Sequence, residues 1–246
     1  MIDLHCHILP FVDDGADNAA VACAMAEYTL LSGVGTIVAT PHCNLRGARG
    51  NYRSEASANG LAMFRALLRQ HRIPLRVLPG AEVFAHMTGF PELLRDKRLP
   101  TLNNSRYLLT EFNFTSSGET MTHLLELISA QGYVPVVAHP ERYAAVQEDH
   151  DLAAYWFSRG YLLQLNKGSI LKRLGKEAYH TALFLLRSGL VDVIASDGHD
   201  MELRTPGFRS LLPTLNTLCP LKYCQILLQS NPEKIIRDLP VRHKVR

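Results

Sequence analysis

Short apolar runs along this chain end, one after another, in a histidine or an acidic residue. The run 37–40, for example, leads to His42, and the run 134–138 leads to His139. Apolar runs of this length are typical of strands in a parallel sheet, and the carboxyl ends of such strands lie on one face. The residues at these ends are His5, His7, His42, Glu82, Glu111, His139, Asp197 and His199. We therefore expect imidazoles and carboxylates from distant parts of the chain to meet there, where they would bind metal ions.

Helical patterns separate these runs. The alternation predicts strands over 2–4, 37–40, 75–80, 106–109, 133–138, 161–165 and 191–195. It predicts helices over 18–32, 54–71, 90–98, 118–131, 152–158 and 176–187, and two or three more within 208–239. Seven strand–helix units favour an α/β barrel of parallel strands over an open sheet.

Length and composition indicate one globular domain. The 246 residues are 47% hydrophobic and 20% charged, which suits a single α/β domain over residues 1–246 whose last ~40 residues are packed helices. The net charge is only +3, and the basic residues are scattered except for the tail 242–246. Such a distribution argues against a nucleic-acid partner.

The location of the protein is predicted from two further features. No run approaches the roughly 18 apolar residues of a membrane span, and the first strand begins at Ile2, which leaves no room for a cleavable signal. The five cysteines are odd in number and form no C-x-x-C pair, as reduced thiols of a cytosolic enzyme would. We expect a cytoplasmic protein without direct membrane insertion, and the sequence leaves its oligomeric state open.

Several motifs carry a resemblance to a known superfamily. They are Asp3–His7 with the following Asp13-Asp14-Gly15, then Ala39–His42, Gly80–Glu82, Ala138–Tyr143 and Ser196–His199. In order and spacing, over residues 1 to about 206, they resemble the polymerase and histidinol phosphatase (PHP) superfamily. Within it, the chain is most similar to the bacterial manganese-dependent protein-tyrosine phosphatases of capsule and exopolysaccharide synthesis.

The resemblance implies a fold and a set of metal ligands. The fold would be a distorted (β/α)7 TIM-like barrel, the PHP fold, with three divalent metal ions at the carboxyl ends of its strands. One ion would take His5, His7, Glu82 and Asp197, a second would take Glu82, Glu111 and His139, and the third would take Asp14, His42 and His199. Mixed imidazole and carboxylate ligands suit Mn²⁺, with Fe or Zn²⁺ as alternatives.

The resemblance also implies a reaction. Arg142 and Arg204 would clamp a phosphate, a role that suits the bidentate guanidinium. A metal-activated hydroxide would hydrolyse phosphotyrosine, because metal binding lowers the pKa of water from about 15.7 towards 7. The partner would be the tyrosine-rich tail of a bacterial tyrosine autokinase that controls polysaccharide synthesis.

Three alternatives remain open on the sequence. His42-Cys43 and Arg49 satisfy the H-C-x₅-R pattern of cysteine-dependent tyrosine phosphatases, whose loop cradles phosphate and whose cysteine is the nucleophile. The same metal centre could instead serve a small-molecule phosphoesterase such as histidinol-phosphate phosphatase. The third alternative is a non-catalytic, metal-stabilised regulatory module.

Some positions depart from the family pattern or have a simpler explanation. Cys43 stands where a second histidine is common, and Phe11 stands where glycine is usual. Asp14 could belong to an ordinary turn, and Glu111 could be a loop residue. The segment 166–169 could form a hydrogen-bonding wall of the site or a plain turn. These departures concern the rim of the site more than its ligands.

Overall fold

The structure is a computed structural model, and the fold is described for residues 1–45, 50–86 and 88–241. The strands are β1 (Ile2–Cys6), β2 (Thr36–Ala39), β3 (His42–Cys43), β4 (Arg76–Pro79), β5 (Glu82–Phe84), β6 (Tyr107–Glu111), β7 (Val134–Ala138), β8 (Leu162–Asn166) and β9 (Val193–Ala195). The longer helices are α1 (Ala19–Leu31), α2 (Glu55–Gln70), α4 (Gly118–Ala130), α6 (Asp151–Ser158) and α8 (Lys176–Arg187).

Shorter helical segments fill the connections and the carboxyl-terminal region. They are α3 (Phe90–Arg95), α5 (Ala144–Glu148), α7 (Lys167–Ile170), α9 (Leu212–Leu218), α10 (Leu221–Gln225) and α11 (Asn231–Ile236), with the 3₁₀ turns η1 (Leu102–Asn104) and η2 (Pro140–Arg142) and the π-helical turn η3 (Ile226–Ser230). The predicted carboxyl-terminal helices are confirmed. The chain is helical from Leu221 through Ile236, so α10, η3 and α11 form one continuous helical segment.

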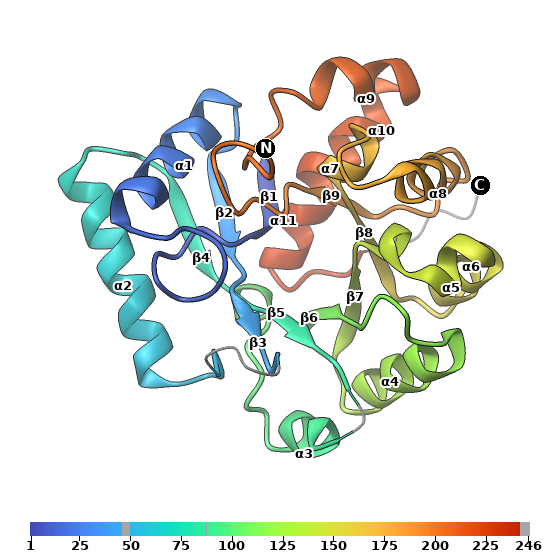
Figure 1. The fold of residues 1–246 in the computed structure, drawn as a ribbon. Coiled ribbons are helices and arrows are strands. Elements are labelled where there is room, and N and C mark those ends of the chain that lie inside the picture. Colours follow the sequence, from blue (N-terminus) through green and yellow to red (C-terminus); the bar gives the residue numbers. More distant parts are fainter. Residues whose placement is uncertain (46–49, 87, 242–246) are drawn as a thin grey trace.

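All ladders between the described strands are parallel. One sheet has the order β1-β2-β4, and the other has the order β3-β5-β6-β7-β8-β9. An isolated parallel bridge pairs Cys6, at the end of β1, with Gly198, beyond β9. Figure 1 shows the strands grouped at the centre of the molecule with the helices around them. The predicted α/β architecture of parallel strands is confirmed.

The expected seven continuous strands are divided differently from the prediction. The second predicted strand is interrupted at Thr40 and Pro41 and resumes as β3, while the third is interrupted at Gly80 and resumes as β5. Proline has no N–H for a ladder, which explains the first break. At Gly80 an added Cβ would lie 2.5 Å from Val38 Cγ1, so the segment after β4 passes too close to β2 for a side chain at this position unless Val38 shifts. The strand ends are thereby bent, and β3 and β5 pair with each other.

Two apolar clusters surround the strands. The smaller one contains side chains from several strands together with Ile235 and Ile236 of α11. It includes Ile2, Tyr107 and Leu162, which begin their strands, so α11 covers the amino ends of the sheet. The larger cluster contains the outer side chains of the strands and the buried faces of the helices. Polar side chains lie at the carboxyl ends of β6 and β8, which are Glu111 and Asn166.

Local capping explains where the principal helices begin. Asn18 accepts a hydrogen bond from Val21 N at the start of α1, and Ser117 accepts one from Thr120 N at the start of α4. Ser54 and Ser57 form a reciprocal capping box at the start of α2. These side chains satisfy backbone donors that have no partner within a helix.

Within residues 1–45, 50–86 and 88–241, no helix has both the length and the apolar character that a membrane span requires.

Candidate metal centre

Glu82, the first residue of β5, lies at the centre of the predicted ligands. Its Oε1 lies 3.3 Å from His5 Nε2 and 2.9 Å from His139 Nε2. Its Oε2 lies 3.3 Å from His7 Nε2 and 3.1 Å from His42 Nδ1. The side chain is buried, and its carboxylate meets four imidazoles from three different parts of the chain. The sequence predicts that these strand ends converge, and the structure places their side chains together.

Asp197 and His199, which follow β9, complete the cluster. Asp197 Oδ1 lies 3.3 Å from His5 Nε2 and 3.6 Å from His7 Nε2. His199 Nε2 lies 3.5 Å from Asp14 Oδ1, and Asp14 Oδ1 also lies 3.3 Å from His42 Nε2. Glu111, at the end of β6, lies 3.7 Å from both His42 and His139. All nine predicted ligands therefore lie in one cluster.

The backbone carries strain at two of these positions. Asp197 has φ +50° and His139 has φ +36°, in the left-handed region that non-glycine residues rarely occupy. Such a conformation costs of order 1–3 kcal/mol and persists where the surrounding structure imposes it, often at functional sites. Here it turns both side chains from the ends of β7 and β9 towards Glu82.

The cluster contains three sets of donors that could each hold a cation. Within each set the donor atoms lie within 4.8 Å of one another: His7, Asp14, His42 and His199; His5, His7 and Glu82; His42, Glu82 and Glu111. The first set adds His7 to the predicted group of Asp14, His42 and His199, and the second contains the predicted His5, His7 and Glu82 without Asp197. The third differs, because it contains His42 where the prediction placed His139. Every donor is an imidazole nitrogen or a carboxylate oxygen, the combination that Mn²⁺, Fe and Zn²⁺ accept.

Unpartnered buried atoms support a fit to cations. Asp197 Oδ1, His199 Nε2 and His139 Nδ1 have no hydrogen-bond partner among the described residues. Buried polar atoms are ordinarily hydrogen-bonded, and each exception needs an explanation. Several of these atoms face the centre of the cluster, where a cation would accept their lone pairs.

Burial and neighbouring charges shift the pKa values of the proposed ligands in different directions. Burial lowers the pKa of His42, but hydrogen bonds to Asp14 and Glu82 outweigh burial and raise it to about 11. Burial and the charge of Glu82 raise the pKa of Glu111 to about 8. Burial lowers the pKa of His139 to about 4, so this imidazole stays neutral and able to donate a lone pair. A metal ion would therefore displace protons from some ligands and not from others.

Three side chains outside the predicted set orient the ligands. Asp13 Oδ2 lies 2.7 Å from His7 Nδ1 and accepts a hydrogen bond from His42 N at 2.8 Å. On β8, Gln164 Oε1 lies 2.9 Å from His5 Nδ1, and its amide donates to Asn166 Oδ1. Asn166 in turn donates to Asp197 Oδ2 at 2.6 Å, so the first residue of the segment 166–169 contacts a proposed ligand. Partners of this kind fix the tautomer and orientation of metal-binding imidazoles.

Sequence reasoning missed Asp13 and Gln164 as supporting residues. Asp13 belongs to the Asp13-Asp14-Gly15 motif, but only its neighbour was predicted to be a ligand. Gln164 interrupts an otherwise apolar predicted strand, and a buried polar side chain in such a run was the available signal.

Both predicted phosphate-binding arginines line the same cavity. It measures about 350 Å³, and Asp14, His42, Glu82, Glu111 and His139 also line it. Arg204 Nη2 donates a short hydrogen bond to Asp197 Oδ2, and Arg142 Nη1 lies 3.7 Å from the same oxygen. The guanidinium of Arg142 also lies 4.4 Å from the ring centroid of Phe114. Two fixed cationic groups thus border the cluster of ligands.

The alternative cysteine nucleophile is poorly placed. Cys43 lies in β3 and is fully buried, and burial raises its thiol pKa to about 12. A nucleophilic cysteine needs a lowered pKa and access to substrate. The arginine of the H-C-x₅-R pattern, Arg49, lies outside the described residues. The environment of Cys43 argues against a thiolate mechanism.

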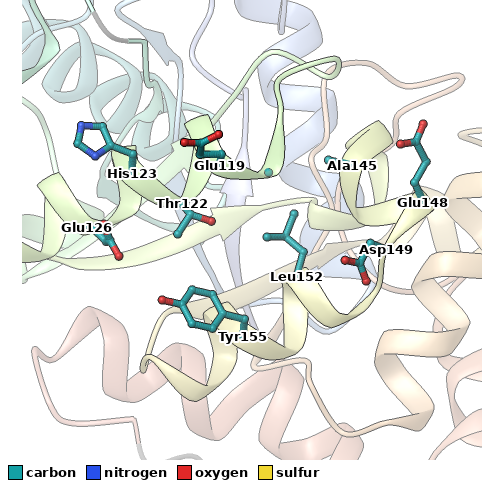
Figure 2. Close-up of a pocket in the computed structure, with 10 residues that line it drawn as sticks. Glu119, Thr122, His123, Glu126, Ala145, Glu148, Asp149, Leu152 and Tyr155 are labelled. Carbon is teal, nitrogen blue, oxygen red and sulfur yellow. The ribbon is translucent and has the colours of Figure 1, made fainter.

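A separate hollow of about 700 Å³ lies between α4, α5 and α6 (Figure 2). Its lining includes four acidic side chains, which are Glu119, Glu126, Glu148 and Asp149. Figure 2 shows these carboxylates spread along the hollow without meeting at one point. None of the predicted site residues lines it. Its acidic surface alone indicates no ligand.

Comparison with known proteins places the chain among capsule-synthesis proteins. The family model for capsular polysaccharide synthesis, CpsB/CapC, matches residues 1–237. The tyrosine-protein phosphatase YwqE of Bacillus subtilis (strain 168) is 35% identical over 206 residues, which are 83% of this chain and 79% of YwqE. The tyrosine-protein phosphatase CpsB of Streptococcus pneumoniae is 31% identical over 243 residues, which are 97% of this chain and 99% of CpsB.

Solved structures agree with the sequence comparison. One solved structure comes from a description of YwqE from Bacillus subtilis and CpsB from Streptococcus pneumoniae as unique metal-dependent tyrosine phosphatases. It matches this chain with a TM-score of 0.89 at 32% identity, and the match covers 99% of this chain and 97% of that chain. The phosphotriesterase of Mycobacterium tuberculosis has a TM-score of 0.61 at 11% identity, with 96% and 94% covered. The second likeness concerns the fold alone.

Proposed function

Because the chain belongs to the CpsB/CapC family of capsular polysaccharide synthesis proteins, we propose that it is a metal-dependent protein-tyrosine phosphatase. The observation that carries the proposal is the single cavity in which Arg142 and Arg204 border the imidazoles and carboxylates around Glu82. Clustered cations with adjacent guanidinium groups suit a phosphate monoester, whose uncatalysed hydrolysis is among the slowest reactions known.

The proposed ligands are those of the sequence prediction: His5, His7, Asp14, His42, Glu82, Glu111, His139, Asp197 and His199. When bound, divalent cations there would neutralise the phosphoryl oxygens and make water acidic enough to serve as a nucleophile at neutral pH. We propose three ions, with Mn²⁺ preferred and Fe or Zn²⁺ as alternatives. The mixed nitrogen and oxygen donors support this choice.

The chain itself would bind and orient the phosphate. Arg204 and Arg142 both approach Asp197 Oδ2, so their guanidinium groups point towards the ligands, where bidentate contacts to phosphate oxygens are available. Asp13 and Gln164 hold His7 and His5 in fixed orientations. Phe84, Phe112 and Phe114 form part of the cavity wall and would contact an aromatic leaving group.

The proposed substrate is a phosphotyrosine polypeptide, specifically the tail of a bacterial tyrosine autokinase that controls capsule or exopolysaccharide synthesis. The names of YwqE and CpsB support a tyrosine-phosphatase activity, and the family description supports the link to capsular polysaccharide. A cytoplasmic location and a single domain over residues 1–246 stay predictions. No observation favours histidinol phosphate as substrate, and the experiment below includes it as a competitor.

The test compares initial rates on a phosphotyrosine peptide and on histidinol phosphate. Rates are measured for the purified protein, after chelation, and after Mn²⁺ is added back. We expect peptide turnover that chelation abolishes and Mn²⁺ restores, and a loss of turnover in His139→Ala and Asp197→Ala proteins that remain folded by circular dichroism. Turnover indifferent to chelation, or a preference for histidinol phosphate, would refute the proposal.

A further inference from the structure

Another cavity lies directly beside Arg204, one of the two arginines proposed to bind phosphate. It measures about 480 Å³, and we call it the side cavity; its lining residues are Asn166, Lys167, Gly168, Arg173, Leu174, Ser196, Asp197, Asp200, Glu202, Leu203 and Arg204. Arg204 lines both this cavity and the cavity of the metal centre. A molecule whose phosphate contacts Arg204 can therefore extend from one cavity into the other.

Two leucines form the outer wall of the side cavity. Leu203 is 76% exposed, which is unusual for a large apolar side chain beside a polar site. Leu174 packs directly on Gly168, where an added Cβ would lie only 3.0 Å from the leucine side chain. The glycine thus allows Leu174 to lie against α7. The two side chains offer apolar surface that no described part of the chain covers fully.

The charges around the side cavity balance. Lys167, Arg173 and Arg204 are basic, and Asp197, Asp200 and Glu202 are acidic, which makes three of each sign. Lys167 is already engaged by backbone oxygens, and Asp200 by backbone N–H groups. A ligand would therefore be selected for apolar contact with the leucines more than for charge.

The loop that carries Leu203 is held rigidly. Asp200 Oδ1 accepts hydrogen bonds from the N–H groups of Glu202 at 2.7 Å, Leu203 at 2.6 Å and Arg204 at 3.1 Å. Just beyond the loop, the buried Lys167 Nζ donates to the backbone oxygens of Thr205 and, at 2.9 Å, Gly207. Because this backbone is already held, a ligand that covers Leu203 does not have to order the loop, which lowers the entropy cost of binding.

We propose that the side cavity binds an apolar side chain next to the phosphotyrosine in the polypeptide substrate. This inference rests on the proposed phosphatase function, because it requires the phosphate to be held at Arg204. The neighbouring residue of the substrate packs between Leu174 and Leu203 while the phosphotyrosine occupies the metal-centre cavity. The side cavity thereby makes the enzyme prefer some peptide sequences over others, and a small phosphate ester without neighbouring residues does not show this preference.

The test uses Mn²⁺-loaded protein and four phosphotyrosine peptides, with leucine or glycine immediately before or after the phosphotyrosine. We expect the wild-type protein to favour one leucine peptide over its glycine partner by about tenfold in kcat/KM, the effect of partial burial of one leucine side chain. Leu203→Ser should reduce this ratio to less than about twofold. Leu31→Ser, which changes a leucine of similar exposure at the end of α1, should retain the wild-type ratio.

The outcomes separate the inference from the function on which it rests. p-Nitrophenyl phosphate has no neighbouring residue, so its turnover reports the phosphatase activity alone. Equal kcat/KM for leucine and glycine peptides in the wild-type protein, or an unchanged ratio in Leu203→Ser, would overturn the side-cavity assignment while the phosphatase stands. Failure to turn over both the peptides and p-nitrophenyl phosphate with Mn²⁺ would overturn the proposed function itself.

Discussion

Replacing Asp13 by alanine should weaken metal binding although Asp13 is not a proposed ligand. Its Oδ2 lies 2.7 Å from His7 Nδ1, on the side of the ring opposite the nitrogen that faces Glu82. The same oxygen accepts the backbone N–H of His42, and Oδ1 accepts that of Gly15. One buried carboxylate therefore orients His7 and ties together the loops that carry two proposed ligands.

The size of the effect follows from these contacts. Loss of a carboxylate that orients a metal-binding histidine typically costs 10- to 100-fold in metal affinity or activity, which is about 1.4–2.7 kcal/mol. Alanine also leaves the N–H groups of His42 and Gly15 without their acceptor, so we expect Asp13→Ala at the upper end of this range. Asparagine retains one acceptor oxygen, and Asp13→Asn should lie at the lower end.

The assay is titration of the metal-free protein with Mn²⁺ by calorimetry, paired with kcat on a phosphotyrosine peptide at saturating Mn²⁺. Asp17→Ala is the matched control, because Asp17 is an exposed aspartate in the same loop. We expect Asp17→Ala to bind Mn²⁺ as the wild-type protein does. If Asp13→Ala binds Mn²⁺ with wild-type affinity and keeps its kcat, the reasoning from the Asp13–His7 contact is refuted.

Three further predictions concern other parts of the site. Cys43→Ser should keep kcat within about threefold, because a buried thiol with a pKa of about 12 supplies no thiolate; inactivation with metal still bound would restore the cysteine mechanism. Affinity for Mn²⁺ should rise by about tenfold or more from pH 6 to pH 8. The reason is that Glu111, with its pKa raised to about 8, and His42, with its pKa raised to about 11, must lose protons to bind metal. An affinity that calorimetry finds unchanged between pH 6 and pH 8 would contradict this. Lys167→Met should lower the free energy of unfolding by about 2 kcal/mol and raise KM for phosphotyrosine peptides. The reason is that the backbone oxygens of residues 205–207 lose a charged donor. Denaturation and kinetics that match the wild-type protein would show that Lys167 does not hold this segment in place.

The order of strands and helices and the positions of the proposed ligands were predictable from the sequence. An apolar run reports that a strand is buried, and a histidine or carboxylate at its end stands out against that background. His139 and Glu82 were found in this way, and both lie in the cluster. The break after β4 was not predicted, because the close approach of Gly80 to Val38 joins residues on two different strands.

The sequence by itself determined which residue types stand at the ends of the strands, since apolar periodicity and local motifs are properties of neighbouring residues. Only the tertiary structure decided that Glu82 lies among four imidazoles, that Asp13 orients His7, that Cys43 is buried, and that Arg204 lines two cavities. The physical reason is that burial, pKa and hydrogen bonding depend on which distant side chains are brought within a few ångströms. Packing of the whole parallel sheet sets those distances, and no single segment of the chain contains them.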